Sequence, residues 1–134
     1  MEKVLPFLMF QDGNAEEAMI YYTSIFEEAK ITSIVRYGAN EPGEEGKVMQ
    51  ATFSIKGQEI MCIDSNIKHQ FSFTPSISIF VICSTDKEID RLFYQLIEDG
   101  QALMPLGDYG FSKKFGWLRL NDRFGVSWQL NLPR

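Results

Sequence analysis

Few side chains in this 134-residue chain have the type and spacing needed for catalysis or metal binding. The only histidine, His69, lies between two apolar strand patterns. Its imidazole either packs in a loop or lies at the rim of a cavity, where it could shuttle a proton near neutral pH. Cys62 and Cys83 lie inside apolar runs without C-x-x-C spacing. This predicts two buried, reduced thiols with no group to activate them.

Neutral polar side chains are more suggestive, because they recur at every second position in two segments. Ser127, Gln129 and Asn131 alternate with apolar residues, and so do Ser76 and Ser78. Successive side chains of a strand point to opposite faces, so each row lies on one face. Such a row usually faces solvent. On a curved sheet with helices outside, it faces the concave side, where neutral donors and acceptors suit an uncharged ligand.

We therefore predict a small-molecule cavity on the concave face of a cupped sheet. Its lining would comprise Phe7, Met9, Ser76, Ser78, Trp117, Gln129 and Asn131, with Met61 or Cys62 as a further apolar wall and His69 as a possible rim residue. Trp117 and Phe115 would cap the cavity or pack in the core. Arg36 and Arg119 could supply cationic groups, but strand alternation leaves their orientation open. Asp122 and Arg123, in a hairpin turn, are expected to set turn geometry.

The elements that would position these residues follow from hydrophobic periodicity. Helices are predicted at about 14–27 and 86–99, with capping-box residues Asn14 and Glu17 in the first and Thr85 and Glu88 in the second. Gly100 occupies the position of a left-handed residue after the second helix. Strands are predicted at 5–10, 30–37, 47–55, 58–64, 76–83, 101–106, 115–120 and 126–132. Lys56 and Gly57 would form a hairpin turn.

The order strand, helix, three strands therefore occurs twice, which indicates an internal repeat. We expect one domain, 1–134, of the α+β class. Module one would span about 1–65, a connecting loop about 66–75, and module two about 76–134. The two βαβββ modules would pair into a cupped, half-closed barrel sheet.

Composition narrows the possible partners. The net charge of -5 disfavours nucleic-acid and anionic-membrane binding, and no apolar run reaches the about 18 residues of a membrane span. The N-terminal residues lack the pattern of a signal peptide, so we expect a cytoplasmic protein.

Three segments resemble a known family: D-G-N-A-E-E-A at 12–18, Y-Y-T-S-I-F at 21–26 and D-R-F-G-V-S-W-Q at 122–129. They are similar to the PhnB-like family of the vicinal oxygen chelate superfamily, which includes glyoxalase I, bleomycin-resistance proteins and extradiol dioxygenases. Members often carry the name 3-demethylubiquinone-9 3-methyltransferase. The resemblance implies paired βαβββ modules, a ligand cavity in each cupped sheet and a homodimer, for which Phe71, Phe73 and Phe111 are apolar candidates.

The resemblance also implies four inward positions that hold a metal in some members of the superfamily. Here they align with Phe7, Ile63 or Asp64, Ser76 or Ser78, and Gln129. Phenylalanine cannot ligate and serine is a poor ligand, so we expect neither a metal nor another cofactor. Methyl transfer is not expected either, because the chain has no G-x-G turn for S-adenosylmethionine.

Three functions remain open at this point. One is a metal-free protein that binds a small molecule. A second is a metal-dependent isomerase, lyase or dioxygenase of the glyoxalase type. A third is a structural dimer whose cup is filled by side chains. The missing metal ligands favour the first.

Overall fold

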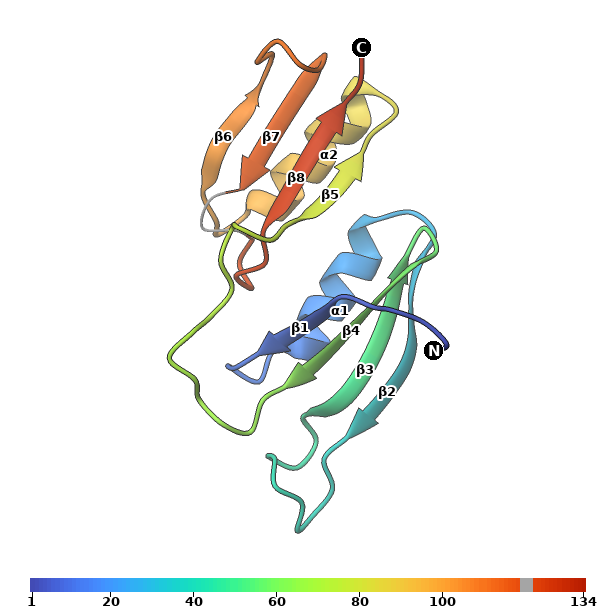
Figure 1. Ribbon diagram of the computed structural model, residues 1–134, viewed down its shortest axis with the longest axis vertical. Coiled ribbons are helices and arrows are strands. Elements are labelled where there is room, and N and C mark those ends of the chain that lie inside the picture. Colours follow the sequence, from blue (N-terminus) through green and yellow to red (C-terminus); the bar gives the residue numbers. More distant parts are fainter. Residues whose placement is uncertain (119–121) are drawn as a thin grey trace. The chain divides into compact units, whose positions relative to one another are not determined.

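The chain forms two compact units, Met1–Gln70 and Phe71–Arg134, each with the order strand, helix, three strands (Figure 1). The computed structural model describes residues 1–118 and 122–134. The predicted α+β class and the two βαβββ modules are confirmed.

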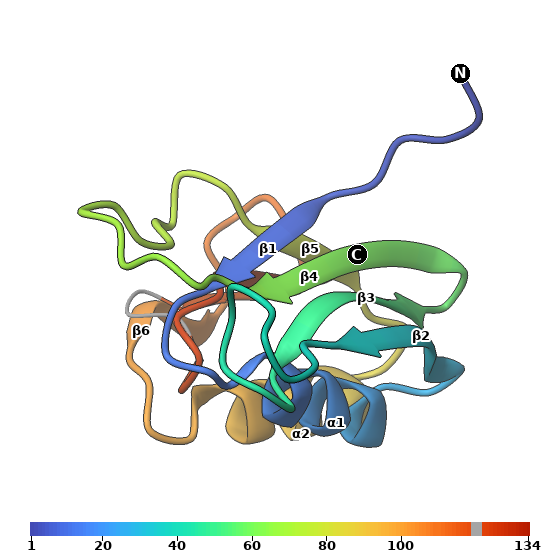
Figure 2. The ribbon, with the colours of Figure 1, turned by 90° about the horizontal axis from the view of Figure 1, so that it is seen from below.

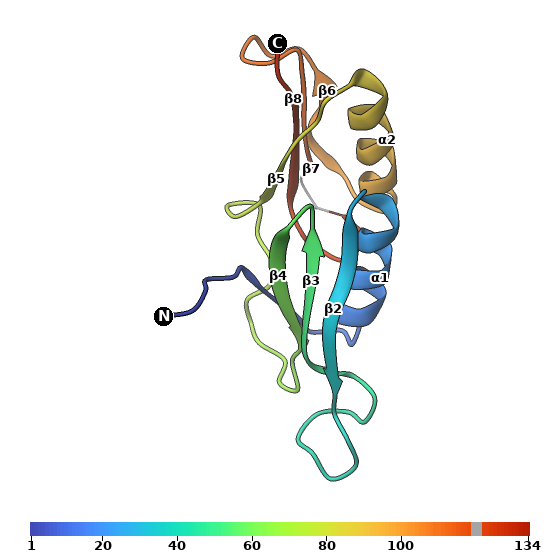
Figure 3. The same cartoon turned by 90° about the vertical axis from the view of Figure 1, so that its right-hand side faces the viewer.

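The first unit contains β1 (Phe7–Phe10), α1 (Ala15–Ile25), β2 (Ala29–Arg36), β3 (Val48–Ile55) and β4 (Gln58–Asp64). Its sheet has the order β1-β4-β3-β2, in which β1 runs parallel to β4 and the other pairs are antiparallel. Helix α1 packs on one face of this sheet (Figure 3). The residues before β1 run away from the sheet on the side opposite α1 (Figure 2).

The second unit repeats this arrangement with β5 (Ile79–Ile82), α2 (Asp86–Ile97), β6 (Ala102–Gly107), β7 (Lys114–Leu118) and β8 (Trp128–Leu132). The sheet order is β5-β8-β7-β6, and β5 is parallel to β8. Helix α2 packs against β6, β7 and β8. In the described part of the chain, no helix is both long and apolar enough to cross a bilayer.

The strand predicted at 76–83 begins later than expected. Ser76 lies in a turn, where its hydroxyl is 2.6 Å from the Thr74 hydroxyl and the Ile77 N–H bonds the Thr74 carbonyl at 3.4 Å. Ser78 directly precedes β5, so the prediction of a strand over 76–78 is wrong. Pro75 has no N–H to donate to a ladder, which favours the turn. Of the strand predicted at 115–120, the last two residues lie outside the described part.

The two helices begin in different ways. Thr85 caps α2 as predicted, because its hydroxyl accepts from the Glu88 N–H at 3.1 Å. Asn14 makes no side-chain cap on α1, so the predicted capping box there is wrong. The Ala15 N–H instead donates to the Asp64 carboxylate at 2.9 Å. A side chain from the end of β4 thus replaces the local cap.

Positive-φ residues define three of the turns. Lys56 (φ 48°) and Gly57 (φ 84°) form the predicted hairpin turn. A positive φ at both central residues matches the right-handed twist of the two flanking strands. After α2 the left-handed residue is Asp99 (φ 63°), and not Gly100 as expected. Gly125 (φ 92°) lies in the turn before β8.

Asp122 organises the turn before β8. One carboxylate oxygen accepts from the N–H groups of Phe124 at 2.8 Å and Val126 at 3.2 Å, and the other accepts from the Trp128 indole at 2.7 Å. The prediction that Asp122 sets the turn geometry is confirmed. The Arg123 guanidinium lies 5.1 Å from the centre of the Phe124 ring.

Gly116 on β7 allows α2 to approach the sheet closely. A Cβ at this position would lie 2.6 Å from Phe93 Cε2 and 2.9 Å from Leu106 Cδ2. Helix α2 buries Ile89, Leu92 and Leu96 in the same layer. A larger residue at 116 would therefore push the helix or its Phe93 ring away from the strand.

We predict that Gly116→Ala lowers the free energy of unfolding by about 1–3 kcal/mol, the usual cost of overpacking. Urea denaturation measures this change. Gly107→Ala is the matched control in the same sheet, because the nearest atoms to its added Cβ are 3.8 Å away. Equal stability of the two variants would contradict the close approach of Phe93.

Candidate functional site

Strand β8 separates two kinds of side chain. Trp128, Leu130 and Leu132 are buried, whereas Gln129 and Asn131 are half-buried. The first three point toward the layer of α2, so the two amides point to the opposite side, which we call the open face of the second sheet. The alternation predicted for this strand is confirmed.

The strand register shows which side chains lie beside Gln129. Gln129 pairs with Phe80 on β5 and with Trp117 on β7. Paired residues of neighbouring strands place their side chains on the same face. Gln129 therefore lies between an aromatic residue on each side. The Phe80 side chain is 52% exposed.

Hydrogen bonds fix the orientation of the Trp117 indole. Its Nε1–H donates to the Ser127 hydroxyl at 3.1 Å, and that hydroxyl is 2.7 Å from the Ser78 hydroxyl. Ser78 in turn donates to the Pro75 carbonyl at 3.4 Å. This chain of bonds explains why Ser127, predicted on the open face, is buried. The indole N–H is therefore occupied, and the Trp117 side chain is half-buried.

Asn131 lies one step further along the open face. It pairs with Ile82 and with Phe115, and its side-chain carbonyl accepts from the Ser112 hydroxyl. Phe115 is buried in a group of aromatic rings, which also contains Phe80, Tyr109 and Phe111. The structure thus brings Trp117, Gln129 and Asn131 onto one sheet, with Ser78 directly before β5 and Ser76 in the preceding turn.

Phe7 and Met9, the other two predicted cavity residues, belong to the first unit. They pair with Met61 and Ile63 on β4, on the face opposite α1. Phe7 is 51% exposed. The alternative wall residue Cys62 is fully buried, so Met61 lies on the open side of this sheet.

Both cysteines are free and buried, as predicted. Burial raises the pKa of the Cys62 thiol to about 12, with a further contribution from the Asp64 charge. Burial likewise raises the pKa of the Cys83 thiol to about 11. A thiol that keeps its proton is a poor nucleophile, so neither side chain provides a reactive group.

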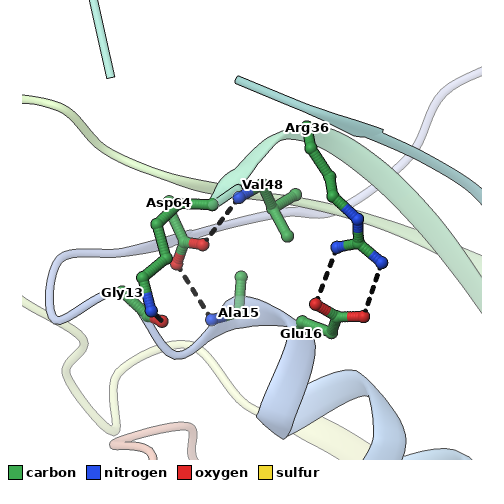
Figure 4. A network of polar contacts seen from close by, with 7 residues as sticks. Gly13, Ala15, Glu16, Arg36, Val48 and Asp64 are labelled. Atoms are coloured by element: carbon green, nitrogen blue, oxygen red, sulfur yellow. Dashed lines mark hydrogen bonds and ion pairs between the residues drawn. The ribbon is translucent and has the colours of Figure 1, made fainter. Parts of the chain in front are cut away.

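Asp64 is a buried carboxylate with both oxygens occupied (Figure 4). One accepts from the Ala15 N–H at 2.9 Å and the other from the Val48 N–H at 2.9 Å. The side chain is 3% exposed. It joins the first turn of α1 to the start of β3. A carboxylate used in this way is not available as the metal ligand that the family alignment allowed.

Arg36 lies beside this network and not on the open side of the sheet. Its guanidinium makes two hydrogen bonds to the Glu16 carboxylate, at 2.7 and 2.8 Å (Figure 4). These bonds raise the pKa of Arg36 and lower the pKa of Glu16. Glu16 is therefore half of an ion pair. Arg119, the other arginine left open, lies outside the described residues.

His69 lies in the loop after β4. Its backbone N–H donates to the Gln11 side-chain carbonyl at 2.6 Å, and its Nε2 is 3.5 Å from the Ser65 hydroxyl. A place for this imidazole at a cavity rim stays a prediction.

The first unit also has two adjoining hollows near the start of α1, of about 350 and 650 Å³. Both are lined by Gly13, Glu44, Lys47 and Asp64. The Lys47 ammonium donates to the Gly13 carbonyl at 3.0 Å, which ties the loop after β2 to the helix start. Sequence analysis missed these hollows, because they form only where this loop folds back on α1.

The donor set does not fit a catalytic metal. Within residues 1–118 and 122–134, no three His, Cys, Asp or Glu side chains gather where one ion could bind them. At the aligned positions, Phe7 cannot ligate, Asp64 is engaged by backbone N–H groups, and the Ser76 and Ser78 hydroxyls are poor ligands. Gln129 alone remains, and an open catalytic site needs about three protein donors.

Comparison with solved structures places this architecture among glyoxalase and bleomycin-resistance folds. A glyoxylase/bleomycin resistance protein/dioxygenase domain from Frankia sp. EAN1pec has a TM-score of 0.67 at 16% identity, covering 100% of this chain and 93% of that one. The fosfomycin resistance protein FosX from Listeria monocytogenes, in complex with Mn(II) and 1S,2S-dihydroxypropylphosphonic acid, has a TM-score of 0.63 at 12% identity, covering 98% and 92%.

Residues 2–131 match the model of the family described as 3-demethylubiquinone-9 3-methyltransferase, and the chain belongs to this family. The PhnB protein from Bacillus cereus is 58% identical, with a TM-score of 0.92 over 98% of this chain and 99% of that one. The resemblance to PhnB-like proteins is therefore confirmed. A comparison with curated proteins gave no match.

We predict that Asp64→Asn lowers the free energy of unfolding by about 2–3 kcal/mol. The substitution directs an NH₂ group at a backbone N–H and removes a charge-assisted hydrogen bond. Arg36→Gln, which breaks only the exposed ion pair with Glu16, is the control and should cost less than about 1 kcal/mol. Urea denaturation compares the two. Similar values for both variants would show that Asp64 does not hold α1.

Proposed function

We propose that this chain binds an uncharged small molecule on the open face of its second sheet, without a metal. The observation that carries the proposal is the arrangement around Gln129. A neutral amide lies between Phe80 and Trp117, and the indole is held in place by Ser127. Aromatic surface with a few oriented polar groups is typical of small-molecule sites. The predicted contribution of Phe7 and Met9 to ligand binding stays a prediction.

The second candidate is a metal-dependent isomerase, lyase or dioxygenase of the glyoxalase type. It is favoured by the fold, since FosX is in complex with Mn(II). It would need two further donors beside Gln129, whereas the aligned Asp64 carboxylate is engaged by backbone N–H groups and the aligned serines are poor ligands. The family description names methyl transfer, but the sequence contains no Gly-rich turn that would bind S-adenosylmethionine.

Two further expectations stay predictions. One is self-association through Phe71, Phe73 and Phe111, and the other is a cytoplasmic location.

Metal analysis combined with a ligand screen tests the proposal. After dialysis, elemental analysis should find no zinc, nickel, iron or manganese in the wild type or in Gln129→Ala. In a screen of uncharged aromatic compounds, those that bind should quench Trp117 fluorescence and raise the melting temperature. A ligand at about 100 times its Kd adds about 2.7 kcal/mol.

Trp117→Phe is the control variant, because it should abolish the fluorescence change and leave the melting-temperature shift detectable. A tightly bound metal in stoichiometric amount, lost in Gln129→Ala, would overturn the proposal in favour of the enzyme.

A further inference from the structure

Resting on the function proposed above, we propose that the ligand is a planar, uncharged molecule with a lactam or similar cis-amide edge. Gln129 would recognise that edge through two hydrogen bonds. The juxtaposition that points to this class is a half-buried amide that no described group hydrogen-bonds, between two aromatic side chains.

The first step concerns the amide itself. Across residues 1–118 and 122–134, no group hydrogen-bonds to the Gln129 side chain, whereas Asn131 on the same face is held by Ser112. A primary amide carries two N–H donors and a carbonyl acceptor. Half-burial on β8 restricts the water that can satisfy them. A ligand that supplies both a donor and an acceptor can therefore pair with both halves of this amide, which no described protein group does.

The second step concerns the shape of the ligand. Neighbouring strands lie about 5 Å apart, so Phe80 and Trp117 flank the amide closely on both sides. Phe80 is half exposed, and the Trp117 indole is held by Ser127. Both rings offer apolar surface on either side of the polar group. A flat ring system with a polar edge fits this surface, because its body contacts the rings while its edge reaches Gln129.

The third step concerns charge. The polar groups described near Gln129 are neutral: Asn131, Ser127 and Ser78. Lys114 on β7 belongs to the other face, where it pairs with Asp86 and Asp90 of α2. The polar groups whose hydrogen bonds are described beside Gln129 therefore carry no charge that would balance an ionic ligand. A carboxylate would also leave the Gln129 carbonyl facing an anion, whereas a lactam pairs N–H with C=O and C=O with N–H.

Two-dimensional NMR with 2-quinolone and 1-methyl-2-quinolone tests this inference, because methylation removes only the lactam N–H. We expect 2-quinolone to shift the Trp117 indole and Gln129 amide signals, and to bind about tenfold more tightly than the methylated compound. The Trp128 indole is an internal reference, because it is buried and bonded to Asp122 at 2.7 Å. Its unchanged position also shows that each variant is folded.

Gln129→Leu should bind both quinolones with equal affinity. Gln50→Leu, on β3 of the first unit, is the matched control and should keep the preference for 2-quinolone. Equal binding of both compounds to the wild type, or a preference that survives in Gln129→Leu, would overturn the lactam edge.

The same titrations separate this inference from the proposed function. If neither quinolone shifts Trp117 but other uncharged aromatic compounds do, the lactam class is wrong and the binding function stands. If no compound in the screen shifts Trp117, both are wrong.

Discussion

Each sheet of this protein is covered by its own helix on one face, and a strand can bury only every second side chain there. That constraint determines the positions of the candidate site. Because Trp128 and Leu130 pack in the layer of α2, Gln129 must point the other way. Residues paired with Gln129 on the neighbouring strands point to the same face, so Phe80 and Trp117 lie on either side of it. The chemistry of the open face is therefore a consequence of how the core is packed.

Two buried carboxylates maintain this packing, one in each unit. Asp64 accepts hydrogen bonds from backbone N–H groups of α1 and β3. Asp122 accepts hydrogen bonds from two backbone N–H groups of the turn and from the Trp128 indole N–H. Asp122 and Trp128 belong to the segment D-R-F-G-V-S-W-Q that carried the family resemblance. Their contacts are structural, since they define where β8 begins and so which of its residues are buried. Gln129 directly follows Trp128, and the segment thereby also sets the orientation of the proposed ligand anchor.

Local patterns predicted the fold well, because helices and strands of this size are determined by spacing within a few residues. Thr85 was found as a cap since its partner Glu88 lies three residues away, and the phase of β8 followed from simple alternation. Asn14 failed as a cap because a distant side chain, Asp64, occupies that role. The close packing of Phe93 on Gly116 and the hollows beside Lys47 likewise depend on segments far apart in sequence. The spacing of residues within one segment cannot predict such long-range contacts.

The most direct test of the account is a crystal structure of the protein soaked with 2-quinolone. We predict density for the ring system between Phe80 and Trp117, with its lactam N–H and carbonyl at hydrogen-bonding distance from the Gln129 amide. Density only in the hollows beside Glu44 and Lys47, or a metal ion coordinated by Gln129, would contradict it.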